Sequence, residues 1–597
     1  MLTQRIRRSF AVLALGGLMA ACGGGGGGGG DSTPPAPPVA APPPAPVVEK
    51  PATRSEAARF LAQASFGATD ASIDRVMAVG YAVWIDEQLA LPATRAHRLH
   101  WDAADAALKA VTPTAAAGQD QVFESFWKQA VTGNDQLRQR VAYALSQIFV
   151  ISLVDGTVGQ NPRAVAAWMD MLGDEGLGTY RNLLETVSRH PMMGVYLSHL
   201  RNQKADPRTG RVPDENYARE VMQLFSLGLV ELNEDGTPRT SGGAPIDTYT
   251  PADISGMAKV FTGWSWACPD WPDNSCFSQG TANGNSDPDR AFKAMLGYPQ
   301  YHSTEAKTFL GTTIAAQSQS DPAASLKTAL DTLAGHANVG PFIGRQLIQR
   351  LVTSNPSPAY VRAVAQAFAN NGSGVRGDMK AVVKAVLMHP EARQVSDSSG
   401  KVREPVLKLA AYLRAFPHSS DTGSWRMGNT DNPATSLGQT PMRSPSVFNF
   451  YRPGYVAPGT ASATSNLVAP ELQIAHETSV AAWVNFMRDN VASGVGQNNG
   501  TVGGVVLNRR DIRPDFTAEL ALAGDPAALV ERVAEKLTYG QAGAALKAEI
   551  ATGVGSIAIP ALNTAGSNQA AIDTARRNRV NAAVLLVLAA PEFQVQR

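Results

Sequence analysis

The sequence predicts a mainly α-helical protein, with a large multi-helical body, long ordered loops and at most one small β-hairpin. Two observations support this fold class. Apolar residues recur at helical spacing after residues that commonly begin helices, and the segments between these helices are rich in Gly, Pro, Ser, Asn and Asp. The one clear hairpin candidate is Val230–Arg239, which turns at Asp235-Gly236.

We expect the body to begin near residue 53. Thr53-Arg54-Ser55-Glu56 has the form of a capping box, and Thr69 caps a second helix that stops at Gly80. Similar start signals precede the later apolar stripes, including Asp321-Pro322 and Pro405. The predicted helices with clear limits are 81–89, 119–131, 135–151, 341–351, 379–388 and 405–416.

Two long segments, 264–320 and 417–470, interrupt this pattern, and loops of such length are often functional. We therefore predict a helical main body over 53–416, an irregular loop region over 417–470, and C-terminal helices over 471–597 that complete the body. The last helix stops before Pro591 as earlier helices stop before Pro191 and Pro390, because the residue before a proline disfavours helical geometry.

The amino terminus indicates export and lipid anchoring. Residues 1–21 hold three arginines and then an apolar stretch that is too short to span a bilayer, which predicts a signal peptide. The stretch ends Leu18-Met19-Ala20-Ala21-Cys22 and resembles the lipobox of bacterial lipoproteins, in which the cysteine is acylated. The alternative is a plain signal peptide with a chance cysteine. Residues 22–52 follow as a Gly- and Pro-rich tether.

The predicted location is the cell envelope, with the membrane contacted through the lipid on Cys22. Gly23 follows this cysteine, and because only Asp at that place favours retention in the inner membrane, we expect the outer membrane. Arg7-Arg8-Ser9-Phe10 partly resembles a twin-arginine signal, so the general and the twin-arginine export routes both stay open.

Two further cysteines, Cys268 and Cys276, are separated by seven residues. In an oxidising compartment such a pair predicts a disulfide that closes a small loop. A metal site is the alternative, but the segment has no Cys-x-x-Cys spacing and no nearby histidine.

Composition and motifs exclude several functions. The formal net charge is +1, and no basic cluster indicates a nucleic-acid partner. A Gly-x-Ser-x-Gly elbow, a His-Glu-x-x-His zinc helix and a P-loop are all absent from the sequence. Gly372–Gly377 formally matches a dinucleotide fingerprint but follows a predicted helix and not a strand. No cofactor is therefore predicted.

The densest unusual stretch is 213–228. Asn216 and Glu220 are four residues apart on a predicted helix, and Arg219 lies beside them. These three are the candidate catalytic residues. The alternative interpretation is that they form a buried structural network. Acid/base catalysis by Glu220 would need a second carboxylate, and Glu215 is the weak candidate. The two residues are five apart, about 140° around a helix, so their side chains diverge.

This stretch resembles the "Asn-Tyr-Ala-Arg-Glu-Leu-x-Glu-Leu-Phe" segment of a bacterial family of proteins of unknown function numbered 1800 (DUF1800), with Gln223 in place of the second Glu. Other segments agree with the family in the same order: 59–67, His190-Pro191, 260–264, His302 before 309–311, and 444–453. The resemblance covers nearly all of 53–597. It implies an exported, helical protein with no named reaction, and a co-exported sulfatase-like protein as a partner.

Further candidate binding residues lie in the long loops. Trp264, Trp266 and Trp271 cluster in and beside the predicted disulfide loop, where aromatic rings either anchor a ligand or cover the core, and Trp264 and Trp266 are the candidates for binding. Arg443, Tyr451 and Arg452 belong to the other loop, where two arginines suit a carboxylate, sulfate or phosphate or else pin the loop to helix ends.

Two functions compete at this point, with a third weaker one. The first is an envelope lipoprotein that serves as a binding or scaffold partner of another exported protein or an envelope polymer. The second is an envelope hydrolase that acts on polysaccharide or sulfated material near Glu220. The third is a metal site built from His190, His302 and Glu220.

Overall fold

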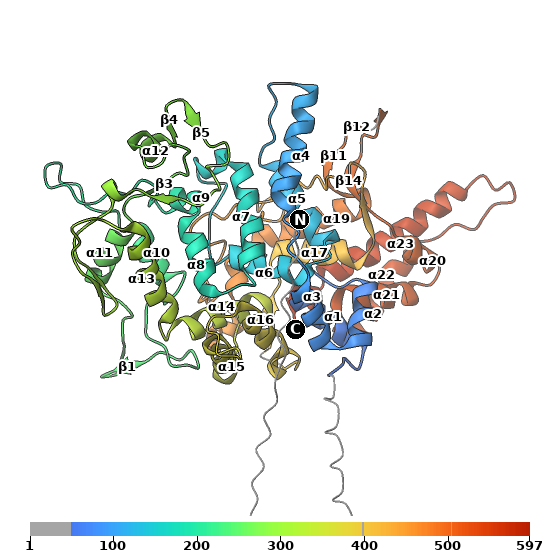
Figure 1. The fold of residues 1–597 in the computed structure, drawn as a ribbon. Coiled ribbons are helices and arrows are strands. Elements are labelled where there is room, and N and C mark those ends of the chain that lie inside the picture. Colours follow the sequence, from blue (N-terminus) through green and yellow to red (C-terminus); the bar gives the residue numbers. More distant parts are fainter. Residues whose placement is uncertain (1–48, 397–398, 503) are drawn as a thin grey trace, which may run out of the picture. The chain divides into compact units, whose positions relative to one another are not determined.

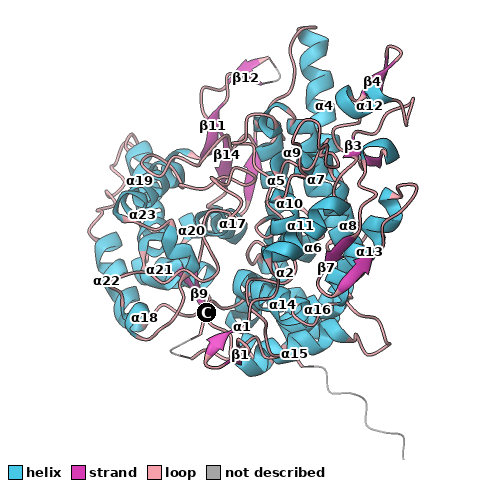
Figure 2. Ribbon diagram, turned by 90° about the vertical axis from the view of Figure 1, so that its left-hand side faces the viewer, coloured by secondary structure: helices cyan, strands magenta, loops and turns pink. Residues whose placement is uncertain are grey.

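The computed structural model describes residues 49–396, 399–502 and 504–597 (Figure 1). The predicted signal peptide, Cys22 and all but the end of the tether lie outside the described residues. The described residues all belong to one compact unit. The described part forms helices joined by long irregular segments and small antiparallel sheets, so the mainly α fold class is confirmed (Figure 2).

The first helices begin at the predicted cap residues. The Thr53 hydroxyl accepts a hydrogen bond from the Glu56 backbone N–H at 3.2 Å, and Thr69 and Ser72 form a reciprocal capping box. The N-terminal helices are α1 (Arg54–Ala64), α2 (Asp70–Val79), α3 (Tyr81–Ala90), α4 (Ala96–Val111), α5 (Asp120–Thr132), α6 (Gln136–Ser146), α7 (Pro162–Glu175), α8 (Tyr180–Arg189) and α9 (Pro191–Tyr196), with a 3₁₀ turn η1 (Val158–Gln160).

Helix α6 is shorter than the predicted span 135–151. It ends at Ser146, and the chain then turns so that the Gln147 side chain reaches the buried carboxylate of Glu404. Residues 148–151 lie outside any helix, but all four are apolar and buried. Their apolar sequence therefore resembled a continuation of the helix.

The middle of the chain adds helices α10 (Asn216–Gln223), α11 (Pro251–Val260), α12 (Asn274–Gln279), α13 (Pro322–Gly335), α14 (Val339–Leu351), α15 (Pro358–Ala369), α16 (Met379–Met388) and α17 (Pro405–Ala415), with η2 (Pro299–Tyr301) and η3 (Pro390–Ala392). Helix α14 packs against α15 and α16, while α17 packs between α5 and α21. In Figure 1, α10, α11 and α13 lie on the left and the C-terminal helices on the right.

The C-terminal part contains α18 (Ala461–Thr464), α19 (Glu477–Ser493), α20 (Thr517–Ala521), α21 (Pro526–Thr538), α22 (Ala544–Gly555), α23 (Gln569–Ala589) and α24 (Pro591–Gln594), with η4 (Pro470–Gln473). Helices α19, α21 and α22 all pack against α23. None of the helices in the described ranges is both long and apolar enough to cross a membrane.

Small antiparallel sheets are more numerous than the single predicted hairpin. The pairs are β1 (Thr240–Ser241) with β2 (Ala244–Pro245), β3 (Trp264–Ser265) with β6 (Leu296–Gly297), β4 (Thr281–Ala282) with β5 (Asn285–Ser286), β7 (Lys307–Phe309) with β8 (Thr312–Ile314), β9 (Lys401–Val402) with β15 (Val595–Gln596), and β12 (Thr501–Val502) with β13 (Val505–Val506). A three-stranded sheet has the order β10 (His418–Ser420), β14 (Arg510–Pro514), β11 (Val495–Asn498).

The predicted hairpin at 230–239 forms, but as a short antiparallel pairing around its turn and without regular strands. Leu232 and Pro238 make an isolated bridge, and the Asn233 backbone N–H donates to the Thr237 carbonyl at 2.8 Å. Regular pairing follows later, in β1 and β2. Strands of two or three residues are too short to produce an alternating pattern, which is why the sequence did not reveal the sheets of the long loops.

Candidate functional site

A groove of about 470 Å³ lies between α14, the segment that follows α10, and the irregular loop near residue 450. We term it the α14 groove. Its size falls within the roughly 300–1,000 Å³ that is usual for ligand sites. The lining side chains come from residues 147–148, 223–236, 342–350 and 447–454.

One face of α14 forms a wall of this groove. Phe342, Arg345, Gln346 and Gln349 recur at intervals of three and four residues, so their side chains project from the same side of the helix. The opposite side carries core residues such as Leu347, which is fully buried. Helix α14 thus joins the hydrophobic core to the groove.

Gly228 fixes the position of the Phe342 ring. Its φ is +77°, in the left-handed region that favours glycine. A Cβ at this position would lie only 2.8 Å from Cε2 of Phe342. The wall of the groove therefore requires glycine here, both for the backbone turn and for the close approach of the ring.

Two arginines at the groove have no acidic partner. Arg345 and Arg452 are exposed and form no ion pair with any described carboxylate. The groove walls partly desolvate the Arg345 guanidinium and so lower its pKa, and no carboxylate offsets that effect. The guanidinium carbon of Arg452 lies 4.6 Å from the centroid of the Phe448 ring, an arrangement that cation–π attraction stabilises.

Several buried polar atoms beside the groove have no hydrogen-bond partner. Among the described residues that line it, these atoms are Gln147 Oε1, Gln346 Nε2, Gln349 Oε1 and Arg350 Nε. An unsatisfied buried polar group costs about 1–3 kcal/mol. No Asp or Glu is present in the described lining, so its formal charge comes from arginine alone.

A buried hydrogen-bond network supports the groove from behind. Oε2 of Glu404 accepts hydrogen bonds from Gln147 Nε2 at 2.7 Å, Gln439 Nε2 at 2.6 Å and the Tyr451 hydroxyl at 2.9 Å. Burial raises the pKa of Tyr451 well above its ordinary value, and the Glu404 charge raises it further. Because Tyr451 directly precedes Arg452, this network holds the loop that carries the exposed guanidinium.

A buried ion pair holds the other end of the same loop. Nζ of Lys401 lies 2.8 Å from Oε1 of Glu471, and both side chains are almost fully buried. The Lys401 ammonium also donates to the Arg350 carbonyl at 2.9 Å, and that carbonyl accepts a second hydrogen bond from Arg140 Nη2 at 2.6 Å. Burial raises the pKa of Glu471, and Lys401 opposes this rise.

The family comparison covers the helices, the groove and the network together. A family model described as "Protein of unknown function (DUF1800)" matches residues 59–595. The chain belongs to this family. Comparisons with curated proteins and with solved structures found no match. The DUF1800 match therefore settles the family predicted from the sequence motifs and assigns no reaction.

The DUF1800 motif residues Asn216, Arg219 and Glu220 do not form one cluster. Asn216 is exposed and donates weakly to the Ser198 hydroxyl at 3.4 Å. Arg219 is exposed and lies 3.5 Å from the Glu215 carboxylate. Glu220 is buried, one of its carboxylate oxygens has no partner, and burial raises its pKa while Arg219 opposes that rise.

The predicted tryptophan site separates into buried and exposed rings. Trp264 is buried and donates from Nε1 to the Val260 carbonyl at 3.2 Å, and Trp266 packs against the core. Trp271 is 46% exposed. The predicted disulfide is confirmed: Cys268 and Cys276 are bonded, with Cα atoms 5.6 Å apart. The interpretation that these rings cover the core therefore applies to Trp264 and Trp266.

The three predicted loop residues, Arg443, Tyr451 and Arg452, lie in three different environments. Arg443 pairs with Asp431 at 2.8 Å and donates to Gln119 Oε1 at 2.5 Å, so it pins the loop to the body. Tyr451 is buried in the Glu404 network. Arg452 alone of this set presents a charged group to the groove.

The hypothetical metal site is not assembled. Both nitrogens of His302 face protein atoms: Nδ1 lies 2.7 Å from the Thr262 carbonyl and Nε2 3.0 Å from the Ser325 hydroxyl. His190 is buried against Trp168, with ring centroids 4.9 Å apart. Within residues 49–396, 399–502 and 504–597, no group of three His, Cys, Asp or Glu side chains is placed to hold a metal ion.

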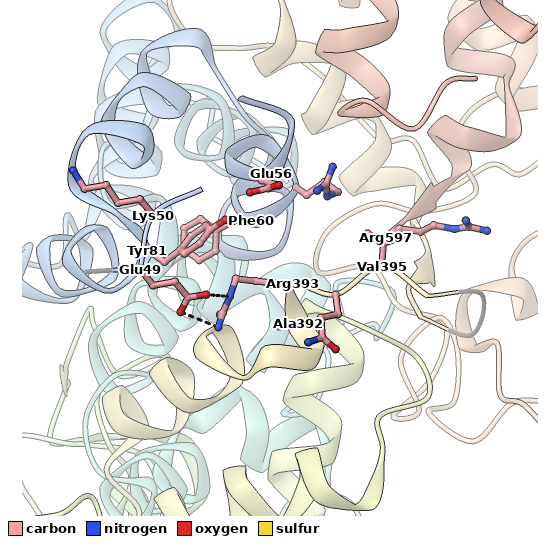
Figure 3. Close-up of a pocket in the computed structure, with 11 residues that line it drawn as sticks. Glu49, Lys50, Glu56, Phe60, Tyr81, Ala392, Arg393, Val395 and Arg597 are labelled. Atoms are coloured by element: carbon pink, nitrogen blue, oxygen red, sulfur yellow. Dashed lines mark hydrogen bonds and ion pairs between the residues drawn. The ribbon is translucent and has the colours of Figure 1, made fainter. Parts of the chain in front are cut away.

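A second cavity, of about 140 Å³, lies where the described chain begins (Figure 3). Figure 3 shows Glu49 paired with Arg393, at 2.7 Å. The Arg393 guanidinium also lies 5.4 Å from the centroid of the Tyr81 ring. This cavity is smaller than usual ligand sites, and its Arg393 charge is already neutralised, so the α14 groove is the better candidate.

Sequence reasoning found Arg452 and missed Arg345, Gln346 and Gln349. The apolar residues of α14 matched a core helix, and its polar residues were assigned no role. A signal was present, because polar or aromatic side chains at 342, 345, 346 and 349 form a continuous stripe beside the core stripe.

Proposed function

We propose that this protein is an exported lipoprotein of the cell envelope that acts as a binding or scaffold partner of another exported protein or an envelope polymer. The observation that carries the binding role is the α14 groove. Its volume of about 470 Å³ suits a ligand, and Leu229 and Phe448 stay 58% and 36% exposed at its walls. Exposed apolar side chains that gather at a concave surface are typical of interaction sites.

The binding role is tested by chemical crosslinking in the native envelope, followed by recovery of the tagged full-length protein and mass spectrometry. Leu229→Ser is expected to reduce the yield of the principal crosslinked species. Val480→Ser is a matched control, since Val480 on α19 is also 58% exposed and does not line the groove. Equal yields from both variants would contradict a role for the groove.

The location rests on the lipobox-like segment that ends at Cys22 and on the tether after it. Acyl chains on Cys22 would bury many methylene groups at about 0.8 kcal/mol each, so membrane attachment would be stable. Labelling cells with radioactive palmitate is expected to mark the protein, and Cys22→Ser is expected to remove the label. Recovery in the outer-membrane fraction tests the predicted membrane. The sulfatase-like partner implied by the family resemblance would appear among the crosslinked proteins.

The alternative proposal is an envelope hydrolase that acts on polysaccharide or sulfated material, with Glu220 as the acid. The observation in its favour is the buried carboxyl of Glu220, whose pKa is raised by burial, as general acids require. Glu220→Gln is expected to abolish hydrolysis of envelope polysaccharide if this proposal holds. A folded variant with unchanged hydrolysis would eliminate this site.

A further inference from the structure

The charges of the α14 groove are one-sided. Arg345 and Arg452 lie at its surface without a carboxylate partner, and the described lining contains no Asp or Glu. Two other arginines of this protein face acids: half-buried Arg443 pairs with Asp431, and exposed Arg509 pairs with Asp421. Two unpaired guanidiniums in one concave site are therefore available to a ligand.

A second, independent observation comes from the wall of the groove. Gln346 is only 8% exposed, yet its Nε2 group has no acceptor. The neighbouring Arg350 is 4% exposed, and its Nε–H is also unpartnered. Each of these groups is a hydrogen-bond donor, and both belong to residues that line the groove, so the wall holds donors that the protein itself leaves without an acceptor.

The remaining surface of the groove is apolar. Leu229, Leu232, Phe342 and Phe448 line it together with the arginines. The Phe448 ring lies under the Arg452 guanidinium, so the charged and apolar parts of the site are adjacent. A ligand that fits must combine a negative group with an apolar group directly beside it.

Building on the proposed binding function, we infer that the α14 groove recognises an oxyanion attached to an apolar group, with Arg345 and Arg452 contacting the oxyanion and Phe448 contacting the apolar part. Guanidinium groups suit this role because their N–H donors match the oxygen pairs of carboxylates, phosphates and sulfates. A cationic ligand is disfavoured by the same arginines.

The inference is tested with a matched pair of fluorescent probes. 1-Anilinonaphthalene-8-sulfonate carries an oxyanion, and N-phenyl-1-naphthylamine has the same rings without it. Both are titrated into the full chain carrying Cys22→Ser, which lacks acyl chains that could themselves take up an apolar probe. We expect the sulfonate to bind at least fivefold more tightly than the neutral probe, and we expect added salt to weaken only the sulfonate.

Variants assign the two parts of the site. Arg345→Gln and Arg452→Gln are each expected to weaken the sulfonate at least threefold and to leave the neutral probe within twofold. Phe448→Ala is expected to weaken both probes. Arg577→Gln is the control, because Arg577 on α23 is exposed and does not line the groove. Circular dichroism confirms that each variant is folded.

The outcomes separate the two proposals. If the probes bind equally and only Phe448→Ala weakens them, the groove binds ligands but the oxyanion inference is overturned. If Phe448→Ala changes neither probe, or neither probe binds, the groove is not the binding site and both proposals fail. Competition by 1-naphthoate, 1-naphthyl phosphate and 1-naphthyl sulfate then tells a carboxylate from a phosphate or sulfate ester. Displacement by 1-naphthylmethanol as strong as by these anions would also overturn the inference.

Discussion

Replacing Lys401 by Met tests the buried ion pair behind the α14 groove. The substitution keeps most of the side-chain length and removes the ammonium that lies 2.8 Å from Glu471 Oε1. Glu471 would then retain a carboxylate that is shielded from water and has lost its ion-pair partner. Removing one partner of such a pair costs about 3–5 kcal/mol, and the hydrogen bond to the Arg350 carbonyl is lost as well.

The expected change in melting temperature follows from the size of the folded unit. An unfolding entropy of roughly 2.1 cal/mol/K per residue gives about 1.2 kcal/mol/K for roughly 550 residues. The Lys401→Met protein should therefore melt about 3–4 °C lower at pH 8, as measured by differential scanning calorimetry.

The destabilisation should also depend on pH. Burial raises the pKa of Glu471 and Lys401 opposes that rise, so removing the Lys401 ammonium should raise the pKa of Glu471 further. A carboxyl whose folded pKa lies above its unfolded value loses stability as pH rises through that window. The deficit should therefore be smaller at pH 5 than at pH 8.

Two controls make this prediction refutable. The double variant Lys401→Met/Glu471→Leu removes both charges and should recover most of the loss. Lys547→Met breaks an exposed pair with Glu531 and should cost less than about 1 kcal/mol. If Lys401→Met melts like Lys547→Met at every pH, the buried pair does not stabilise the fold as argued.

Three further predictions concern other parts of the molecule. Gly228→Ala places a Cβ 2.8 Å from the Phe342 ring at φ +77°, so we expect a loss of about 1–3 kcal/mol in urea unfolding; an unchanged midpoint contradicts this, and Gly210→Ala, also at positive φ but in open space, reports the backbone cost alone. Burial lowers the pKa of His190 from 6.5 to about 3, so the stability that depends on its neutral form is present above pH 6.5 and is lost as pH falls toward 3, at about 1.4 kcal/mol of unfolding free energy per pH unit. His190→Asn, which keeps a cap for α9, should make the unfolding free energy depend less on pH in this range. Parallel plots of unfolding free energy against pH for the two proteins would refute this assignment. Cys268→Ser opens the loop closed with Cys276 and should cost about 2–3 kcal/mol; faster hydrogen exchange over 266–301 should accompany it, and protection equal to that of the parent protein would show that the loop is held by packing alone.

Local signals predicted much of the fold. Thr53, Thr69 and Asp321 cap helices as expected because a cap depends only on residues within one turn. The Cys268–Cys276 disulfide was equally local. The end of α6 was misplaced, since Gln147 leaves the helix to meet Glu404, which is 257 residues away in sequence.

The candidate site was less accessible to sequence reasoning. Arg452 stood out because it lies in a long loop, whereas Arg345 was hidden in a helix whose apolar residues matched a core element. Glu404 read only as the residue before a helix-starting proline. Its role depends on three donors from separate segments, Gln147, Gln439 and Tyr451, and that convergence is a property of the tertiary fold.

The sequence separation of the groups behind the groove affects how the protein can be assembled and divided. Arg140 reaches a carbonyl 210 residues later in the chain, and Gln596 reaches the Leu351 carbonyl 245 residues earlier. Such non-local contacts form slowly during folding. A fragment that stops before Glu404 would leave Gln147 without its carboxylate acceptor. We therefore expect translation of nearly the whole chain to precede closure of this region, and we expect pieces cut within 147–404 to need chaperones and not to behave as independent domains.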